Sequence, residues 1–414
     1  MNRVDAVSSH VCGGPSNVYR DEKRSDDVVI CAALRTALCK ARAAAEHTLV
    51  AIGVVWAAIE RTGVDPHTIG DIQISSILQP GPSLVPARMA ALMAGIPVEV
   101  PADRQCSNGI LAVANVASRI KAGYIRIGIA AGVESMSKTR YFYAPQFNNE
   151  GLSSLLSYDL QAAWNMSPLP DSVARHEAAR SCITQLGTTS ENVASRFGIT
   201  REAQDRMAVE SHRKACKAQR DGLFDEEIVP VETKVVDSKT GESTTVTVTR
   251  DEGCRPDTTL EGLASLRPAF SKDGCTTAGN ASQMTDGAAC VFLARYRAFS
   301  AVGVPPEIMG VGPAAAIPAV LAQTGLGIDD IDIFEVNEAF ASQATYCVNK
   351  LKIPAAKLNP KGGAIALGHP LAATGIRQIV TLLPELKRRK GKIGVVSMCI
   401  GGGLGAALVI FNEQ

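Results

Sequence analysis

The chain has 414 residues, 46% of them hydrophobic and 20% charged, which is the composition of an ordinary globular protein of two or three domains. A formal net charge of +1 and only 5% aromatic residues argue against a nucleic-acid partner. The eleven cysteines are an odd number, and the nearest two, Cys31 and Cys39, stand eight residues apart. This spacing fits neither a disulfide framework nor a zinc knuckle, so we expect a reducing compartment and no metal.

The first 26 residues are polar and hold no apolar stretch long enough for a secretory signal. Within them, five residues separate Arg3-Val4 from His10-Val11, and on a helix Val4, Val7 and Val11 would share one side. This arrangement resembles a type-2 peroxisomal targeting signal, which an import receptor reads as a helix. A frayed tail that matches the pattern by chance remains the alternative.

Strands and helices alternate along the next part of the chain. The apolar patterns predict a strand at 28–32, a helix at 47–61, a strand at 72–78, a helix at 87–94 after three prolines, and a strand at 125–133. Such alternation predicts a largely parallel sheet that is covered on both faces.

Cys106 stands just before a predicted helix. Ile110, Val113, Ala114, Ala117 and Ile120 recur every three or four residues and build one apolar face, while Arg119 and Lys121 suit the helix C-terminus. The backbone N–H groups and the dipole at a helix N-terminus favour a thiolate, which makes Cys106 a candidate nucleophile. A small buried hydrophobic residue is the alternative.

The pattern changes over residues 138–266, which we predict to be an inserted subdomain with helices at 191–197 and 201–219 and an alternating Thr/Val segment at 231–249. Strands return at 289–294, 331–336 and 393–398. Because strands 72–78 and 125–133 correspond in kind to strands 331–336 and 393–398, the sequence predicts two duplicated α/β halves.

Residues 393–411 are nineteen residues without a charge, about the length of a membrane span. The glycines at 401, 402, 403 and 405 divide them, so two strands joined by a glycine turn are predicted instead. A dinucleotide-binding fingerprint at Gly401 is rejected because the chain has no room for the helix and strand that must follow it.

Three further stretches stand out. Residues 362–370 place His369 on a glycine-rich loop before a helix, and residues 398–403 place Cys399 at the end of a strand. Residues 275–282 form a loop of small residues that could admit a narrow ligand. Together with the segments around Cys106 and Asn337, they resemble the thiolase family. Further matching motifs are at 132–137, 201–205, 266–270, 277–280 and 337–340.

The resemblance implies the thiolase fold, an α/β architecture with two duplicated halves in an αβαβα arrangement. It divides the chain into a targeting segment (1–26), a first half (27–137 and 267–295), an inserted loop subdomain (138–266) and a second half (296–414). It also implies a homodimer or homotetramer. The segment from Arg3 to Val11 predicts a location in peroxisomes or a related organelle, with the mitochondrion or cytosol as alternatives.

The family implies a role for each matching residue. Cys106 would take the acyl group, His369 would activate it, and Cys399 would act as acid and base at the carbon alpha to the thioester. Asn337 would hold a water that forms an oxyanion hole with His369, and backbone N–H groups of Gly401 and Cys106 would form the other. The residues expected to bind substrate are Ser282 and Ala278 near the pantetheine arm of coenzyme A, and Met309 and Phe340 in the acyl pocket.

The implied reaction is thiolysis of a 3-ketoacyl-CoA, with coenzyme A as a substrate and neither a cofactor nor a metal. Thiolate attack on a carbonyl gives an acyl-cysteine that coenzyme A can clear, and backbone donors stabilise the developing oxyanions. Two other functions remain open: a biosynthetic acetoacetyl-CoA thiolase and a weakly catalytic acyl-CoA- or lipid-binding relative. Individually, His369 and Asn337 could also be helix caps and Cys399 a buried strand residue.

The chain departs from the family pattern in four places. The loop at 41–45 lacks the usual glycine, the segment 138–181 is longer, and Ala372 replaces a glycine. The segment between Ala294 and Pro305 is too short for the usual helix and strand together. We therefore expect the second sheet to lose an inner strand, with weaker activity or stability, unless residues 296–304 supply a shortened strand by themselves.

Overall fold

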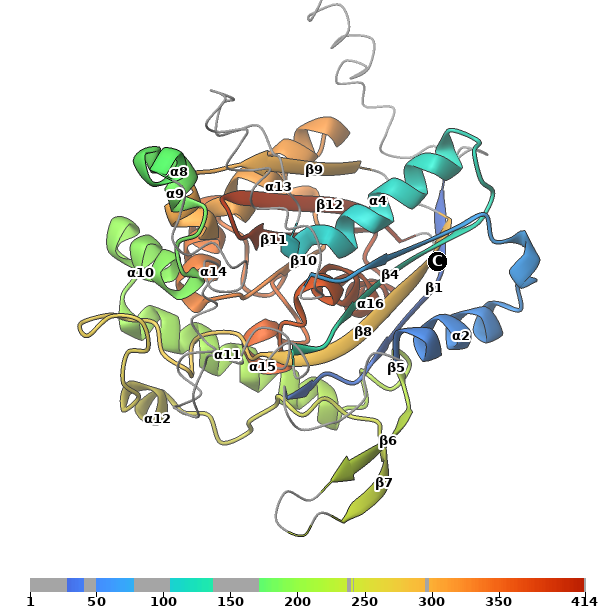
Figure 1. Ribbon diagram of the computed structural model, residues 1–414, viewed down its shortest axis with the longest axis horizontal. Helices are drawn as coiled ribbons and strands as arrows, with labels where there is room; N and C mark the ends of the chain where they lie inside the picture. The colour runs from blue at the N-terminus through green and yellow to red at the C-terminus, as the bar shows by residue number, and fades with distance from the viewer. Residues whose placement is uncertain are drawn as a thin grey trace, which may run out of the picture.

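The computed structural model describes residues 28–40, 50–77, 105–136, 171–236, 240, 242–294 and 298–412. Three sequence predictions lie outside these residues: the targeting segment, the helix at 87–94 and the loop at 41–45. Figure 1 shows two sheets stacked with helices between them and on their outer sides.

Both sheets have the same strand order and directions. The first contains β3 (Asp71–Ser75), β4 (Gly128–Glu134), β8 (Thr285–Ala294), β1 (Val29–Thr36) and β5 (Ile228–Val229), with β2 (Cys39–Lys40) paired to β8. The second contains β10 (Ile333–Val336), β11 (Ile393–Ile400), β12 (Leu404–Phe411) and β9 (Ala298–Gly303). In each sheet the first two strands are parallel, and the third is antiparallel to both of its neighbours. The two halves are therefore duplicated in topology.

The expectation of a largely parallel sheet, made for the first part of the chain, is wrong, because β8 runs antiparallel to both β4 and β1. In the second sheet, β12 is also antiparallel to its neighbours, and it follows β11 through the glycine turn 401–403. A connection that short can only join antiparallel strands. The two-strand prediction for 393–411 is correct, and no helix in the described part of the chain is long and apolar enough to cross a membrane.

The helices complete five layers. Helices α4 (Asn108–Lys121) and α16 (Leu371–Arg389) pack against each other between the sheets. Helix α2 (Val50–Thr62) covers the outer face of the first sheet, and α13 (Gly312–Thr324) covers that of the second, with α14 (Ala341–Leu351) beside it. Most residues of α16 are buried, as expected of a helix between two sheets. The predicted αβαβα arrangement is confirmed.

Strand side chains fill a core on each face of each sheet. Val396 belongs to the central core with Ile110 and Ile376 from the two middle helices, whereas its neighbour Val395 packs with Ile317 of α13 on the other side. Successive strand residues point to opposite faces, so a strand buried on both sides must be apolar throughout. This explains the charge-free run at 393–411.

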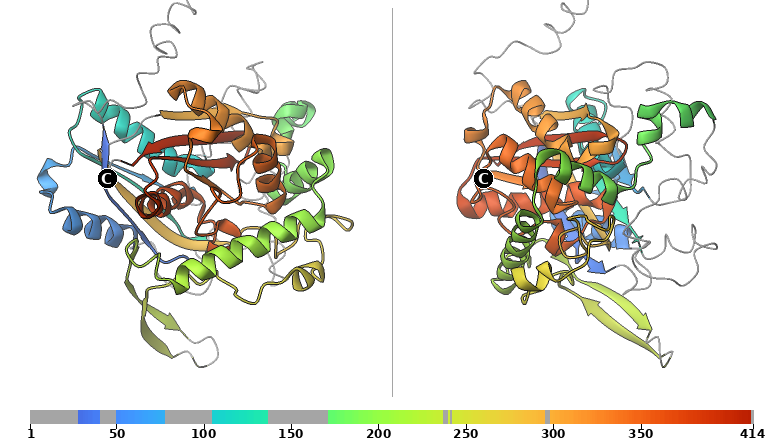
Figure 2. Two further views of the ribbon diagram at one scale, coloured as in Figure 1. Left: turned by 180° about the vertical axis from the view of Figure 1, so that it is seen from behind. Right: turned by 90° about the vertical axis from the view of Figure 1, so that its left-hand side faces the viewer.

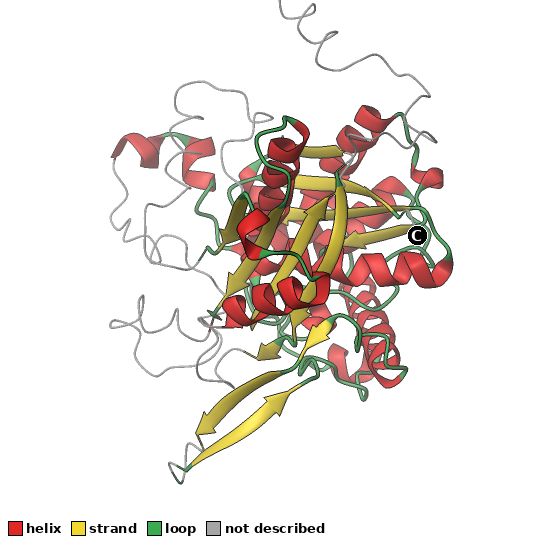
Figure 3. Ribbon diagram, turned by 90° about the vertical axis from the view of Figure 1, so that its right-hand side faces the viewer, coloured by secondary structure: helices red, strands yellow, loops and turns green. Residues whose placement is uncertain are grey.

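The inserted segment wraps around one end of the molecule. It contains α8 (Asp171–Arg175), α9 (Glu177–Ser181), α10 (Leu186–Phe197), α11 (Arg201–Arg220), α12 (Leu260–Ala264) and a hairpin of β6 (Val231–Val236) and β7 (Ser243–Val248). Thr200 caps α11 through its hydroxyl, and Gly198 ends α10 in the left-handed region. The hairpin extends away from the body (Figure 3). The other short helices are η3 (Pro66–Thr68), η4 (Gln105–Ser107), η5 (Pro306–Val311), η6 (Ile328–Asp330) and α15 (Ala364–Leu367).

Strand β9 settles one expectation about the short segment after Ala294. Only residues 295–297 separate β8 from β9, and β9 pairs with β12 from Ala298↔Val409 to Gly303↔Leu404. The expected loss of a strand is wrong, and the alternative of a shortened strand holds. Whether the short link weakens activity stays a prediction.

Candidate active site

The duplicated fold brings Cys106 and His369 together. Cys106 lies in η4 immediately before α4, and His369 stands two residues before α16. Because both helices occupy the middle layer, their N-terminal ends meet: α16 packs against both η4 and α4, and β11 packs against η4. The sequence prediction that Cys106 precedes a helix is correct.

His369 is buried and held at three atoms. Its Nδ1 lies 2.7 Å from Oγ1 of Thr374, its Nε2 lies 3.3 Å from Nδ2 of Asn337, and its backbone N–H donates to the carbonyl of Gln283 at 2.9 Å. Burial, and then the charge of Arg377, lowers the pKa of His369 to about 3. The imidazole is therefore neutral at pH 7 and able to accept a proton. No side chain caps α16 at Pro370, so His369 is not the cap of that helix.

Asn337 follows the end of β10 and faces the imidazole. Its backbone N–H donates to the carbonyl of Ser397 on β11 at 2.8 Å. Its Oδ1 is buried and has no hydrogen-bond partner among the described residues. Helix α14 begins at Ala341 with Phe340 at its N-cap, so the plain N-cap interpretation of Asn337 is wrong.

Cys399 lies near the end of β11 and is 2% exposed. Burial raises the pKa of its thiol well above the ordinary value, and the charges of Cys106 and Cys347 raise it further. The interaction between Cys399 and Cys106 identifies the two sulfurs as electrostatic neighbours. At neutral pH the side chain is a protonated thiol, which can act as a proton donor.

The glycine turn after Cys399 packs tightly against the start of η5. Gly402 and Gly403 have φ angles of +80° and +90°, which favour glycine. The carbonyl of Gly403 accepts from the N–H of Val304, just beyond β9, at 2.8 Å. A Cβ on Gly403 would meet the Val304 carbonyl at 2.4 Å. Strand β9 thus supports the turn that contains Gly401.

The residues expected to bind substrate lie on three segments: the loop that contains Ala278 and Ser282, the segment before α14 that contains Phe340, and η5, which contains Met309. The N–H of Ser282 donates to the carbonyl of Ala339 at 3.0 Å, and Ala281 forms a β-bridge with Phe340. Met309 and Phe340 share an apolar cluster with Cys399, whereas Ala278 is exposed on the loop.

Sequence reasoning missed four residues around these positions. Leu186 and Phe270 pack against the Cys399 cluster, and the Phe270 and Phe340 rings meet edge to face, with centroids 6.2 Å apart. Thr374 and Gln283 hold His369 in place. The hydroxyl of Thr374, in the first turn of the helix after His369, was the one signal visible in the sequence. Leu186, Phe270 and Gln283 come near the site only through the fold.

Ala372 fits its position in the first turn of α16. Its N–H donates to Oε2 of buried Glu134 at 3.2 Å, and it is not among the positive-φ residues of the described chain. Alanine in place of the usual glycine therefore carries no backbone strain here. Its carbonyl lies close to Gly109 and Gly132, where a Cβ would come within 2.4 and 2.5 Å.

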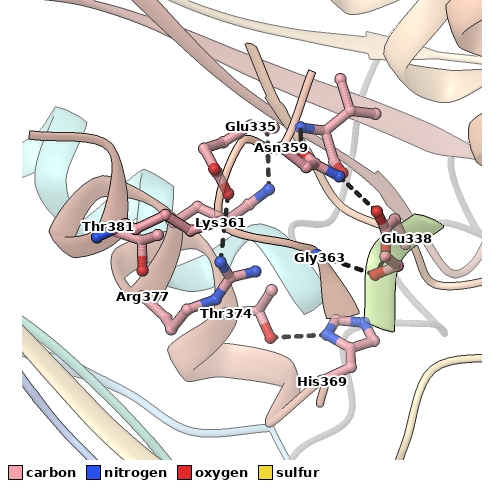
Figure 4. A network of polar contacts seen from close by, with 12 residues as sticks. Glu335, Glu338, Asn359, Lys361, Gly363, His369, Thr374, Arg377 and Thr381 are labelled. Carbon is pink, nitrogen blue, oxygen red and sulfur yellow. Dashed lines mark hydrogen bonds and ion pairs between the residues drawn. The ribbon is translucent and has the colours of Figure 1, made fainter. Parts of the chain in front are cut away.

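A buried polar network adjoins the His369 loop (Figure 4). Glu338 accepts from Ser211 at 2.6 Å, from Asn359 at 2.7 Å and from the N–H of Ile365 at 3.2 Å. Deeper in the fold, Arg377 pairs with Glu335 at 3.2 Å. Burial raises the pKa of Glu335 to about 7 although Arg377 opposes the shift. Within the described residues, no cluster of His, Cys, Asp or Glu side chains could hold a metal ion.

Comparison with models of known protein families identifies the family to which this chain belongs. The model of the thiolase N-terminal domain matches residues 28–297, and that of the C-terminal domain matches residues 290–412. The chain belongs to the thiolase family.

Individual relatives are similar over most of their lengths. The chain is 51% identical to the peroxisomal 3-ketoacyl-CoA thiolase 1 of Arabidopsis thaliana over 93% of this chain and 87% of that protein. It is 48% identical to the peroxisomal 3-ketoacyl-CoA thiolase of Homo sapiens, with 99% of each chain covered. Among solved structures, the dimeric peroxisomal thiolase of Saccharomyces cerevisiae is 43% identical, with a TM-score of 0.76, covering 96% of this chain and 100% of that one. A human mitochondrial 3-ketoacyl-CoA thiolase in complex with CoA is 32% identical, with a TM-score of 0.74, covering 94% and 98%.

Proposed function

We propose that this protein is an acyltransferase that cleaves 3-ketoacyl-CoA with coenzyme A, giving acetyl-CoA and a shortened acyl-CoA, in peroxisomal β-oxidation. One observation supports this proposal most directly. Cys106, His369, Asn337 and Cys399 lie close together near the N-terminal ends of α4 and α16, and they provide two cysteine thiols, a neutral imidazole and an amide. The similarity to peroxisomal thiolases over nearly the whole chain supports the substrate class and the compartment.

In the first half-reaction, the Cys106 thiol gives its proton to neutral His369, and its sulfur adds to C3 of the substrate. The C2–C3 bond then breaks, leaving an acyl thioester on Cys106 and the enolate of acetyl-CoA. The Cys399 thiol protonates that enolate at C2. A thiol of raised pKa stays protonated until this step, which suits it to the role.

In the second half-reaction, the Cys399 thiolate takes the proton of incoming coenzyme A, whose sulfur attacks the acyl thioester. Cys106 leaves and regains its proton from His369. We propose that Asn337 holds a water that stabilises one oxyanion together with His369, and that the N–H groups of Gly401 and Cys106 stabilise the other. The unpartnered Oδ1 of Asn337 supports the first assignment, and each donor is worth about 3 kcal/mol of transition-state stabilisation.

The remaining assignments belong to the same proposal. Coenzyme A binds as a substrate, with Ser282 and Ala278 near its pantetheine arm, and Met309 and Phe340 line the acyl pocket. The protein forms a homodimer, as the yeast relative does. An import receptor binds the segment from Arg3 to Val11, and the boundaries of the two halves and the inserted subdomain are those inferred from the sequence.

Peptide mapping tests the nucleophile. Incubation with a 3-ketoacyl-CoA in the absence of free coenzyme A is expected to leave the shortened acyl group on Cys106. An adduct on Cys399 instead would reverse the two roles. The absence of any adduct together with tight acyl-CoA binding would favour a non-catalytic relative.

Two further experiments test the substrate and the compartment. Thiolysis of a long-chain 3-ketoacyl-CoA is expected to exceed that of acetoacetyl-CoA, and activity confined to acetoacetyl-CoA would indicate the biosynthetic thiolase. Residues 1–27 fused to a fluorescent protein are expected to give a punctate peroxisomal signal that Arg3→Glu abolishes. A diffuse signal from the unmutated fusion would contradict the targeting assignment.

A further inference from the structure

Helix α11 and the segment 251–255 lie side by side and run in opposite directions. Near the end of the helix, Nε2 of Gln219 donates to the carbonyl of Asp251 at 3.2 Å. Earlier in the helix, Nδ1 of His212 accepts from the N–H of Arg255 at 3.3 Å. Helix α11 is the long light-green helix along the lower side of the left view in Figure 2.

These two contacts fix the position of a pair of cysteines. His212, Cys216 and Gln219 are spaced by four and three residues, so they share one face of α11. With His212 opposite Arg255 and Gln219 opposite Asp251, Cys216 lies opposite the residues between them, which include Cys254. In agreement, burial raises the pKa of the Cys254 thiol, and the neighbouring Cys216 raises it further.

The two thiols differ in their exposure to solvent. Cys216 is buried, whereas Cys254 is partly exposed, and both are reduced in this structure. An oxidant can therefore reach Cys254 from solvent, and the resolving thiol is already beside it. Neither cysteine has a part in the thiolysis described above.

We propose that Cys216 and Cys254 form a reversible disulfide that clamps α11 to the segment 251–255. Each thiol loses its proton and one electron as the S–S bond forms, while hydrogen peroxide is reduced to water or glutathione disulfide to two glutathione thiols. A dithiol reductant reverses the reaction. Because the pKa of Cys254 is raised, thiolate is scarce at neutral pH, so the bond forms slowly and faster as the pH rises.

The clamp would act on a segment that braces the active site. The carbonyl of Gly253 accepts from Nε2 of Gln283 at 2.9 Å, and the carbonyl of Gln283 accepts from the N–H of His369 at 2.9 Å. Asp251, two residues earlier, binds the buried Arg35 through both of its carboxylate oxygens. Oxidation would therefore fix the support of the His369 loop to α11 and restrict the unfolded chain between residues 216 and 254.

Peptide mapping of the full-length protein tests the proposal. The reduced protein is treated with glutathione disulfide at pH 7 and pH 8.5, alkylated, and digested with endoproteinase Glu-C, which separates the two cysteines at Glu226 and Glu252. We expect a linked pair of peptides containing Cys216 and Cys254, more of it at the higher pH, and none after treatment with dithiothreitol. The same product is expected in a Cys106→Ser variant, because the catalytic thiol takes no part.

Thermal melts provide the second measurement. Oxidation is expected to raise the melting temperature of wild type by about 3 °C or more, whereas Cys254→Ser should show no such rise. Exposed Cys31 supplies the control, since Cys31→Ser should behave as wild type does. Alkylation of both thiols without a linked peptide, a link between two different chains, or an oxidation-induced rise that persists in Cys254→Ser would each overturn the proposal.

Discussion

At the scale of single residues, the site depends on how His369 is held. Its two ring nitrogens have partners on different elements, Thr374 on α16 and Asn337 after β10. When the amide of Asn337 donates to Nε2, the proton of the neutral ring stays on Nδ1 and is donated to Thr374. Thr374 thus orients the base and keeps Nε2 available for a proton.

The variant Thr374→Val tests this positioning role. Loss of the hydroxyl should lower kcat by about two- to tenfold, the worth of one hydrogen bond, with little change in KM. Thr374→Ser keeps the hydroxyl and should retain activity close to that of wild type. Equal losses in both variants would indicate that packing of the methyl group, and not the hydrogen bond, is what matters.

The second residue-scale prediction concerns Cys399. Cys399→Ala should reduce thiolysis to near background because no group remains to protonate the enolate. Cys106 should still react with iodoacetamide in this variant, since His369 is intact. Turnover like that of wild type would exclude the acid/base role, and loss of alkylation would show that the substitution disrupts the site as a whole.

At the scale of elements, the glycine turn depends on the segment that follows β9. Gly403→Ala combines a positive φ with a clash against the backbone of Val304 and Pro306. We expect a loss of stability greater than the strain of about 1–2 kcal/mol for a left-handed alanine, together with reduced turnover. Gly325→Ala is the matched control, because Gly325 also has a positive φ, +67°, with nothing within 4 Å of its Cβ position. Urea unfolding and thiolysis rates compare the two, and equal effects would mean that the close approach is unimportant.

At the scale of the whole molecule, buried charges join the parts of the chain. Glu227, from the inserted segment, accepts from Arg35 on β1 at 2.8 Å, from Lys361 at 2.8 Å and from Thr381 on α16 at 3.0 Å. The Arg35 and Lys361 cations also lie over the ring of Phe224, at 5.2 and 5.1 Å. One carboxylate therefore connects both halves with the inserted segment.

Glu227→Gln should destabilise the protein by about 3–5 kcal/mol, because it leaves a buried cation without its counter-charge. The effect is measured as a fall in the urea midpoint at pH 7. Glu202→Gln removes a carboxylate from an exposed pair with Arg206 and should leave the midpoint unchanged. A similar midpoint in both variants would show that the network contributes specificity and not stability.

Buried histidines predict how stability responds to acid. Burial, and then Arg255, lowers the pKa of His212 to about 4 from its ordinary 6.5. The unfolded chain therefore takes up a proton as the pH falls below about 6.5, while the folded chain resists it until about 4, so stability is lost across this range. In His212→Asn, whose amide oxygen can still accept from Arg255, the urea midpoint should fall less between pH 7 and pH 5. His369 acts in the same direction, so part of the loss should remain, and an unchanged loss would contradict the assignment to His212.

The sequence by itself determined the local elements and the reactive side chains. The three- and four-residue spacing after Cys106 predicted α4, and the glycines at 401–403 predicted the division into β11 and β12. These predictions depend on local properties of the chain: the periodicity of helices, the backbone conformations that favour glycine, and the apolar sequence of a strand that is buried on both faces. The resemblance to thiolases supplied the layered fold and the candidate residues.

Only the tertiary structure decided which distant residues meet. Strand direction can depend on pairing partners far along the chain, as it does for β8 between β4 and β1, so the first sheet was misjudged as largely parallel. The direction of β12, in contrast, follows from the short glycine turn that precedes it. The short strand β9 forms because six of its residues pair with β12. The length of the segment between Ala294 and Pro305 alone could not predict this pairing. Contacts between distant elements also define the roles of Thr374, Gln283 and the Cys216–Cys254 pair. Periodicity shows which side of an element is buried, whereas the partner on the other side is fixed by the packing of the whole chain.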